Sequence, residues 1–378
     1  MSIFASYDSA LDSLKSRGRY RSLISRSGHD FSSNDYLGLA ASDTLRSAAI
    51  DALERGVGLG SGGSRLLRGN ADEHEHLESE ATQFFGVERA LFMGCGFAAN
   101  TAIFSTLPRQ EDLVVYDALI HASTHDGLKL GRAETVAFKH NDADDAEEKI
   151  KEWRDSGGSG RVWLSVESVY SMDGDLAPIA DLVDVARRHE AIIVIDEAHA
   201  TGLFGSLGRG LAHDYAGDRN IVSLHTCGKS LGASGALICG SAPLIETLIN
   251  KARGFIFSTA PSPLNAALVR AALNDLRDNP SRQKAAHELI AHAHQQAFET
   301  CGLSELQSQI IPVIIGDDKK VMALAARLQD NGFDVRGIRP PTVPRGTARL
   351  RISITLNVSA DVVSQMFSTL AREREAIG

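Results

Sequence analysis

The chain has 378 residues, of which 43% are hydrophobic and 23% charged. This length is more than one ordinary domain holds, so we expect two lobes. The net charge of −9 argues against a nucleic-acid-binding surface, which would need a basic face. No apolar run reaches the length of a membrane span, and the N-terminus has the pattern of an amphipathic helix rather than a signal peptide. We therefore expect a soluble, cytoplasmic protein.

The cysteines of this chain are scattered and form no CxxC pair. They are Cys95, Cys227, Cys239 and Cys301. A disulfide framework or a zinc site is not expected, and a reducing compartment suits the chain.

Residues 1–30 are expected to form an N-terminal helical arm, a helix followed by a basic loop. From about Phe31 to Leu276, apolar runs alternate with amphipathic helical segments. The candidate strands are Ala90–Met93, Leu113–Tyr116, Thr135–Phe138, Val162–Val166, Ala191–Ile195, Ile221–His225 and Ala236–Cys239. The candidate helices between them include Ala71–Phe85, Asp142–Asp155 and Ile179–Glu190. Strands that are apolar on both faces and separated by helices predict an α/β fold with a mainly parallel, covered sheet.

The pattern changes after the break at Leu276–Pro280. A long helix is followed by a smaller α+β pattern, whose expected elements are Ile310–Ile315, Lys319–Asn331, Leu350–Ile354 and Ala360–Ile377. We therefore expect a large domain over residues 31–276 and a small C-terminal domain over residues 277–378.

Two strand ends carry the residues with the most chemistry. Asp196 follows a buried apolar run, with His199 three residues later, and Lys229 lies in a Gly- and hydroxyl-rich turn after another run. Ligands of α/β sheets gather beyond the carboxyl ends of the strands. An amine and a carboxylate there suit an aldehyde cofactor that forms a Schiff base and has a ring nitrogen to pair. The plainer alternatives are a turn-capping acid and a phosphate-binding lysine.

A nucleotide hydrolase is the alternative from a different class. Ser223–Ser230 comes near a P-loop, and the segment Asp196–His199 could be taken for an acidic motif. However, Ser223 replaces the first glycine, and the lysine follows the acidic motif instead of preceding it. The sequence therefore does not favour a P-loop enzyme.

Small residues open the helix expected after the strand at Ala90–Met93. The segment Met93–Asn100 exposes backbone N–H groups at a helix N-terminus, which makes a plausible phosphate cradle. His121 follows the next strand and could stack on a flat ring, although a lone histidine is more often structural. The Gly-rich loop Gly58–Ser64 is interpreted as a loop of close approach or a flexible turn.

Two further patterns have competing interpretations. Glu73-His74-Glu75-His76 suggests metal binding, but helical positions two apart face different ways, so an acidic solvated face is expected and no metal site. Arg349 and Arg351 alternate, so they share one face of a strand. One of them could bind a substrate carboxylate with both guanidinium nitrogens. The alternative is a salt bridge on an exposed edge.

Several motifs together resemble one known family. They are Asn34–Leu39, Gly60–Arg65, Ser171–Asp175, Asp196–His199, Gly208–Gly210 and Gly228-Lys229. The chain resembles the α-oxoamine synthases, which are pyridoxal-phosphate-dependent enzymes of fold type I, the aspartate-aminotransferase-like fold. These enzymes condense an amino acid with an acyl thioester. The resemblance covers nearly the whole chain.

Within the family, Ile338–Pro344 and Gly346–Arg351 are most similar to the members that join L-alanine to a pimeloyl thioester, with loss of carbon dioxide, in biotin biosynthesis. Members that use glycine, such as 2-amino-3-ketobutyrate ligase and 5-aminolevulinate synthase, remain the alternative. A simple aminotransferase fits the Gly-rich loop and His199 less well. The resemblance also implies a homodimer with its active site at the subunit interface, and an acyl group carried by coenzyme A or by a carrier protein.

The resemblance implies roles for individual residues. Lys229 would form the Schiff base, Asp196 would pair with the ring nitrogen and His121 would stack on the ring; these are the expected catalytic residues. The expected cofactor contacts are Gly96, Phe97, His121, Ser171, Asp196, His199, Thr226 and Lys229, with Ser258 and Thr259 of the partner subunit. The expected substrate contacts are Arg17, Asn34, His121, Thr342 and Arg351, with Arg19 and Arg21 as rivals of Arg17.

Overall fold

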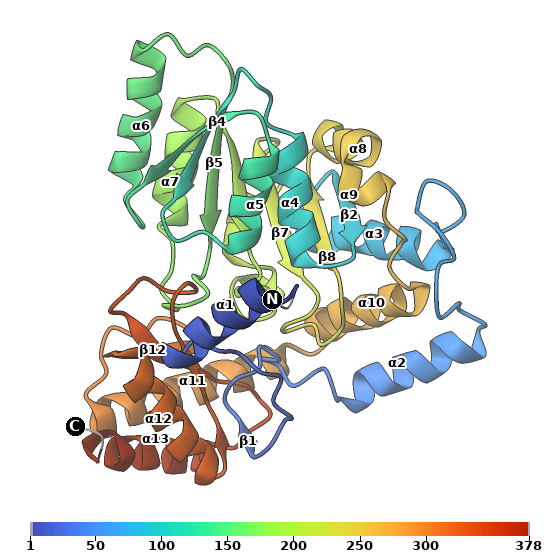
Figure 1. The fold of residues 1–378 in the computed structure, drawn as a ribbon. Coiled ribbons are helices and arrows are strands. Elements are labelled where there is room, and N and C mark those ends of the chain that lie inside the picture. The colour runs from blue at the N-terminus through green and yellow to red at the C-terminus, as the bar shows by residue number, and fades with distance from the viewer. Residues whose placement is uncertain (1–2, 377–378) are drawn as a thin grey trace. The chain divides into compact units, whose positions relative to one another are not determined.

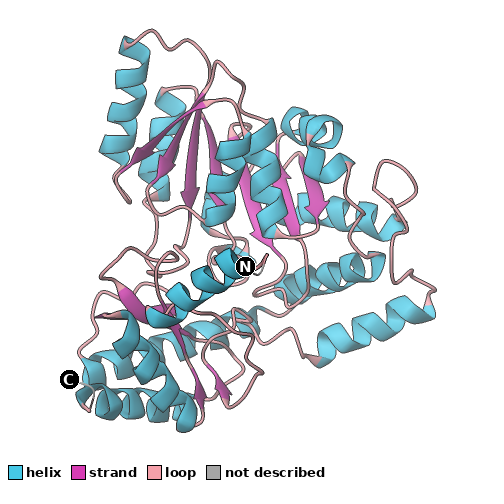
Figure 2. Cartoon of the chain, viewed as in Figure 1, coloured by secondary structure: helices cyan, strands magenta, loops and turns pink. Residues whose placement is uncertain are grey.

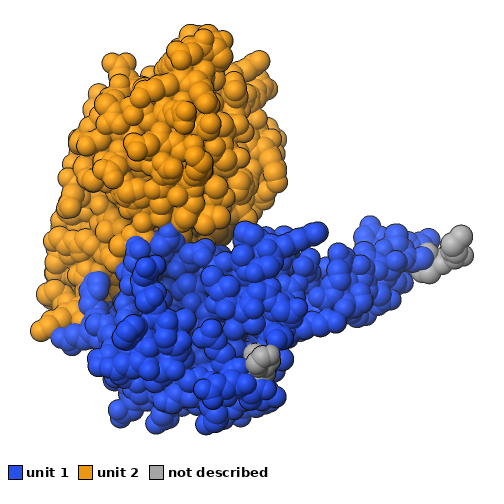
Figure 3. All heavy atoms as spheres, turned by 90° about the vertical axis from the view of Figure 1, so that its left-hand side faces the viewer, with its two compact units in different colours: residues 1–34, 172–175, 285–378 blue, residues 35–171, 176–284 orange. Residues whose placement is uncertain are grey.

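The computed structural model describes residues 3–376, so Met1, Ser2 and Ile377 of the expected terminal helices lie outside it. Figure 1 labels its elements, and Figure 2 distinguishes helices, strands and loops. The chain divides into two units, coloured in Figure 3. Unit 1 contains residues 1–34, 172–175 and 285–378, and unit 2 contains residues 35–171 and 176–284.

Unit 2 is built on a seven-stranded sheet (Figure 1). In sheet order the strands are β2 (Arg89–Met93), β8 (Ala236–Gly240), β7 (Ile221–Thr226), β6 (Ile192–Asp196), β5 (Val162–Glu167), β3 (Leu113–Asp117) and β4 (Glu134–Phe138). β8 runs antiparallel to both of its neighbours, and the other adjacent pairs are parallel. The expected mainly parallel sheet is therefore confirmed, and each predicted strand matches an observed one to within one residue at either end.

Helices cover both faces of this sheet because neighbouring strand residues point to opposite sides. Val115 packs in a core cluster with residues of α6 and α7, whereas Val114 packs in a second cluster with residues of α4 and α8. The helices of unit 2 are α2 (Asp43–Glu54), α3 (Asp72–Phe85), α4 (Gly96–Thr106), α5 (Ala122–Leu130), α6 (Ala143–Asp155), α7 (Ile179–Arg188), α8 (Ala242–Lys251), α9 (Arg253–Ile256) and α10 (Pro263–Asp278). Short 3₁₀ turns lie at Ser206–Gly208 and Leu211–Tyr215. Within residues 3–376, no helix is both long and apolar enough to cross a membrane.

Unit 1 contains a three-stranded antiparallel sheet with β12 at its centre. Its elements are α1 (Ala5–Ser16), β1 (His29–Asp30), β9 (Ile310–Gly316), α12 (Asp318–Asp330), β10 (Phe333–Asp334), β11 (Arg336–Ile338), β12 (Ala348–Ser353) and α13 (Ala360–Glu375), with most of α11 (Pro280–Cys301). β12 is the central strand of this sheet, and Arg349 and Arg351 are buried. The alternative of an exposed edge is therefore wrong, although Arg349 does form a salt bridge.

The short segment 172–175 belongs to unit 1, although its neighbours in the chain belong to unit 2. Asp173 forms an ion pair with Arg349 of β12. Gly174 has a φ of +72°, and a Cβ there would clash with the carbonyl oxygen of Ile310. Only glycine adopts this positive φ without strain and also leaves room for the carbonyl oxygen.

The expectation of a solvated acidic face on α3 is wrong for two of its residues. Glu73 and His74 are buried. Glu73 binds Arg55 at 2.5 Å and Arg270 at 3.0 Å, while Nε2 of His74 lies 2.8 Å from the carbonyl oxygen of Pro261. These contacts tie α3 to α10 and the loop before it. Within residues 3–376, no cluster of His, Cys, Asp and Glu side chains could hold a metal ion.

The interior strand β5 gives a test of this core. Leu164 is fully buried in the cluster with α6 and α7, so Leu164→Ala should lower the free energy of unfolding by about 2–5 kcal/mol, through lost burial and a residual cavity. Denaturant unfolding measures the change. Leu130→Ala is the matched control: Leu130 is 68% exposed, and its loss should change stability by no more than about 0.5 kcal/mol. Equal effects at both positions would contradict this assignment of the core.

Candidate active site

Asp196 is fixed at the end of β6 by two hydrogen bonds. Its Oδ2 accepts from Nδ2 of Asn100 at 2.7 Å, and its Oδ1 accepts from the backbone N–H of Ala198 at 2.9 Å. Only 8% of Asp196 is exposed. Donors to both oxygens stabilise a carboxylate rather than a carboxylic acid, so this side chain is suited to pair with a cationic group.

Lys229 lies in the turn after β7 and begins a short chain of polar contacts. Its Nζ lies 2.7 Å from Nε2 of His199, and Nδ1 of His199 lies 2.6 Å from the hydroxyl of Tyr36. When Lys229 is an ammonium it donates to Nε2, so the ring proton of His199 sits on Nδ1 and is donated to Tyr36. The contact gives the lysine amine a fixed direction and a neighbouring proton acceptor.

The N-terminus of α4 comes close to the end of β7. A Cβ added at Gly96 would lie 2.5 Å from Cγ2 of Thr226, so only a glycine allows this approach. Cys95 caps the helix, because its Sγ accepts from the N–H of Ala98 at 3.4 Å. The free N–H groups of a helix start beside a threonine hydroxyl form a site for an anion such as a phosphate.

His121 is the N-terminal cap of α5. Its Nδ1 lies 2.7 Å from Oγ of Ser123, and Ser123 Oγ in turn accepts from Asn100 at 3.1 Å. Burial lowers the pKa of His121 below its usual value; the charge of Lys229 lowers it further, while Asp196 opposes the change. A neutral imidazole next to both residues is suited to lie against a flat aromatic ring.

These residues of unit 2 fit pyridoxal phosphate in their chemistry. The amine of Lys229 suits the aldehyde, the carboxylate of Asp196 suits the ring nitrogen, and the start of α4 with Thr226 suits the phosphate. The absence of a side chain at Gly96 allows Thr226 to approach the start of α4. The contact of each residue with the cofactor remains a prediction. The same holds for Ser258 and Thr259, which are exposed and follow α9.

Four of the five residues predicted to contact substrate lie in unit 1, and His121 lies in unit 2. The four are Arg17, Asn34, Thr342 and Arg351. Arg351 donates to Asn34 Oδ1 at 3.1 Å and to Ser353 Oγ at 2.7 Å. Its guanidinium is thus held on two sides while it remains nearly buried. Such fixation prepares a planar donor group for a carboxylate.

The three arginines of the N-terminal arm differ in their contacts. Arg21 donates to Oγ1 of Thr342 at 3.0 Å, whereas Arg17 folds back onto Ser13, and Arg19 pairs with Asp318 at 2.6 Å. The prediction gave Arg17 and Thr342 as contacts of the acyl substrate and kept Arg19 and Arg21 as rivals of Arg17. All three arginines line one groove of unit 1, together with Arg345 and apolar side chains. These include Leu11, Leu14, Pro340, Pro341 and Val343.

Four residues near the site were not predicted from the sequence. They are Tyr36, Asn100, Ser123 and Glu167. A signal existed for two of them: Asn100 is a lone amide in an apolar helix, and Glu167 is a lone acid at the end of an apolar strand. Buried polar groups of this kind need hydrogen-bond partners, so each predicts a polar contact inside the fold.

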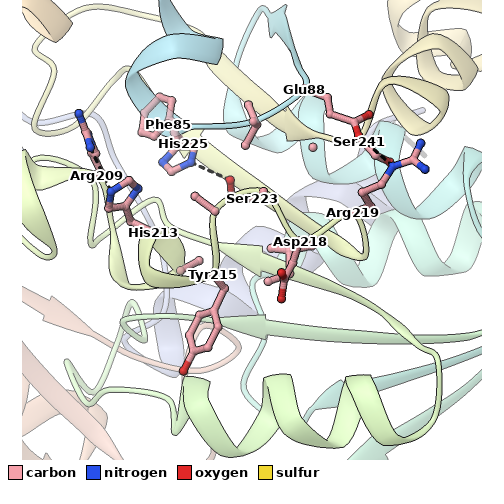
Figure 4. A pocket seen from close by; sticks show the side chains of 16 residues that line it. Phe85, Glu88, Arg209, His213, Tyr215, Asp218, Arg219, Ser223, His225 and Ser241 are labelled. Carbon is pink, nitrogen blue, oxygen red and sulfur yellow. Dashed lines mark hydrogen bonds and ion pairs between the residues drawn. The ribbon is translucent and has the colours of Figure 1, made fainter.

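A pocket at the opposite edge of the sheet, near the start of β7, carries none of the predicted site residues (Figure 4). Its polar side chains bind one another: Arg209 contacts His213 at 3.0 Å, and Arg219 pairs with Glu88 at 2.8 Å. His225 stacks on Phe85. These contacts indicate a structural role for the pocket.

Comparisons of this chain with known proteins agree on one family. Residues 27–368 match the model of the class I and II aminotransferases. The chain is 40% identical to the 8-amino-7-oxononanoate synthase of Geobacter sulfurreducens over 97% of both chains. It is 38% identical to that of Chromobacterium violaceum, over 93% of this chain and 90% of the relative.

Solved structures give the same fold. The serine palmitoyltransferase of Sphingomonas wittichii superposes with a TM-score of 0.90 at 27% identity over the full length of both chains. The 8-amino-7-oxononanoate synthase of Francisella tularensis gives a TM-score of 0.75 at 26% identity over 92% of this chain and 98% of the other. The mainly parallel sheet of unit 2 and the matched motifs agree with these likenesses. The chain therefore belongs to the class I and II aminotransferase family of fold type I and, within it, to the pyridoxal-phosphate-dependent α-oxoamine synthases.

Proposed function

We propose that this enzyme condenses L-alanine with a pimeloyl thioester, giving 8-amino-7-oxononanoate, carbon dioxide and the free thiol in biotin biosynthesis. The observation that carries the proposal is the identity of 38–40% with proteins named 8-amino-7-oxononanoate synthase, over at least 90% of this chain. The cluster of Lys229, Asp196 and His121 supports it, since this chemistry needs an amine, an acid and a flat partner for the ring.

Unit 2 would hold the cofactor. Lys229 Nζ would bind its aldehyde carbon, Asp196 its ring nitrogen, and the start of α4 with Thr226 its phosphate. The remaining proposed contacts are Phe97, Ser171 and His199, the last two at the ring oxygen, with Ser258 and Thr259 of the partner subunit. Bound in this way, pyridoxal phosphate supplies an electron-withdrawing ring that stabilises negative charge on the α-carbon of alanine.

The protein residues would move one proton and orient two substrates. Lys229 Nζ takes the α-proton of alanine and later returns a proton to the product, and His199 Nε2, 2.7 Å away, holds the amine in place. Arg351, fixed by Asn34, binds the carboxylate of alanine. This fixation orients the bonds at the α-carbon, which contributes to the rate through positioning.

The groove of unit 1 suits the acyl substrate. A pimeloyl group is a chain of methylenes that ends in a carboxylate, and the groove combines apolar walls with four arginines, Arg17 and Arg21 among them. The contact between Arg21 and Thr342 makes Arg21 as strong a candidate for the carboxylate as Arg17. Whether coenzyme A or a carrier protein delivers the acyl group stays an open prediction, as does the cytoplasmic location.

We also propose a homodimer. Leu59, Leu67 and Phe257 of unit 2 are 70%, 85% and 73% exposed, and Phe257 directly precedes Ser258 and Thr259. The segment after Phe257 is hydrogen-bonded to the loop that follows Leu59, through Ala260 N and Gly63 O. Apolar side chains exposed together in this way favour coverage by a second chain.

Lys229→Ala should abolish the covalent attachment of the cofactor and lower kcat/KM by about 10²–10⁴-fold or more, because the general base is lost. Absorbance after gel filtration, and peptide mass after borohydride reduction, measure attachment. The control is Lys139→Ala: this lysine is 76% exposed and should leave both properties unchanged. A reduced adduct on another lysine would contradict the proposed role.

Thiol release with matched substrates tests the reaction itself. Alanine with pimeloyl-coenzyme A should give the highest kcat/KM among alanine, glycine and serine combined with pimeloyl, short and long acyl thioesters. Serine and a long acyl chain are included because several similar structures are serine palmitoyltransferases. Preference for glycine or serine would assign a different member of the family.

Mixed dimers test the shared site. Lys229→Ala and the double variant Ser258→Ala/Thr259→Ala should each be inactive or weak alone. Co-expressed, they should recover up to about a quarter of wild-type activity, because one of the two sites in a mixed dimer is intact and half of the dimers are mixed. No recovery, with mixed dimers shown by mass, would place Ser258 and Thr259 in the site of their own chain.

A further inference from the structure

Three adjacent strands of the sheet each end in an acidic residue. Asp117 ends β3, Glu167 ends β5 and Asp196 ends β6, and these strands are neighbours in the order β6-β5-β3. Glu167 and Asp196 are register partners. The three residues are 0%, 3% and 8% exposed. We call them the acidic row; three negative charges so close together and so far from water would be very costly.

The two outer members of the acidic row have donors for their charge. The donors are Leu119 N, Asn141 N and His140 Nδ1 for Asp117, at 2.8–2.9 Å, and Asn100 Nδ2 and Ala198 N for Asp196. Burial raises the pKa of Asp117, but the hydrogen bonds from His140 and the two amides outweigh it and hold the pKa below its usual value. Both outer residues are thus suited to remain carboxylates.

Glu167, in the middle, lacks such support. Its Oε2 accepts one hydrogen bond, from the N–H of Ser171 at 3.2 Å, and its Oε1 is buried without a hydrogen-bond partner among residues 3–376. The charged groups that act on it are Asp196 from β6, Asp117 from β3 and Lys229 from the turn after β7. Burial first, and then the charge of Asp196, raise the pKa of Glu167 to about 8, and the lysine offsets only part of this rise.

We propose that Glu167 keeps its proton at neutral pH and acts as a positioning residue, which holds the turn at Ser171 and adds no second negative charge beside Asp196. A neutral carboxyl group carries an O–H that can donate from the oxygen that lacks a partner. A second carboxylate beside Asp196 would stabilise the ammonium form of Lys229, the form that cannot take a proton. Only this effect on Lys229 rests on the proposed function; the proton on Glu167 does not.

The pH dependence of unfolding of cofactor-free protein tests the proton on Glu167. The carboxyl group binds its proton more tightly in the folded protein, with a pKa of about 8, than at its usual value of 4.5. The stability that it contributes is therefore complete below pH 4.5 and is lost as the pH rises to 8. Glu167→Gln imitates the neutral group and cannot lose a proton. Between these pH values, the unfolding constant of the wild type relative to E167Q should grow by about tenfold per pH unit, and then level off.

Glu148→Gln is the matched control, since Glu148 is exposed on α6. Its ratio to the wild type should stay constant with pH. A constant ratio for E167Q as well would mean that Glu167 is ionised in the folded protein, and would overturn the proposal. If E167Q does not fold, Glu167→Ala serves in its place, because it also lacks a titrating group.

Two further readouts distinguish a neutral from a charged group. The infrared difference spectrum of wild type minus E167Q at pH 7 should show the C=O stretch of a protonated carboxyl group, and its absence overturns the proposal. With cofactor bound, E167Q should keep kcat/KM within about threefold of the wild type, and a loss of about tenfold or more would show that the charge is required. Unfolding and infrared spectra need no substrate, so their outcome is independent of the proposed reaction.

Discussion

The hydrogen bond from Asn100 to Asp196 is the interaction on which the site of unit 2 depends. It joins the second turn of α4 to the end of β6, and the same amide also donates to Ser123 at the start of α5. One buried side chain thus links the end of β6, α4 and the start of α5, the three elements proposed to hold the ring nitrogen, the phosphate and the ring face. Because a buried amide must satisfy its donors, the three elements cannot shift separately without losing these bonds.

The ionisable groups at the carboxyl edge of this sheet have different surroundings. Asp196 accepts two hydrogen bonds, whereas Glu167, inferred to be protonated, accepts one. Burial lowers the pKa of His121. Such separation of ionisation states by local surroundings is typical of sites that transfer protons.

Much of the architecture could be predicted because its signals are local. The strands of unit 2 are apolar on both faces, so their positions follow from composition alone, and Asp196 and Lys229 stand out at their ends. Contacts between distant segments could not be foreseen. Glu73 was expected in solvent because its ion-pair partner Arg270 lies nearly two hundred residues later, and the sequence of its own helix does not indicate this partner. Similarly, spacing alone could not predict which of Arg17, Arg19 and Arg21 lies beside Thr342, because Thr342 is more than three hundred residues away in the chain. The roles of Ser258 and Thr259 depend on a second chain and remain predictions.

The insertion of residues 172–175 into unit 1 has a consequence for how the protein can be divided. The chain crosses from one unit to the other at four points, so no single cut separates them into two continuous fragments. An excised piece spanning residues 35–284 would carry a Gly174 and an Asp173 whose partners, Ile310 and Arg349, had been left behind. The segment after Ser171 would then have lost these contacts. Neither unit is therefore a self-sufficient module that recombination could transplant intact.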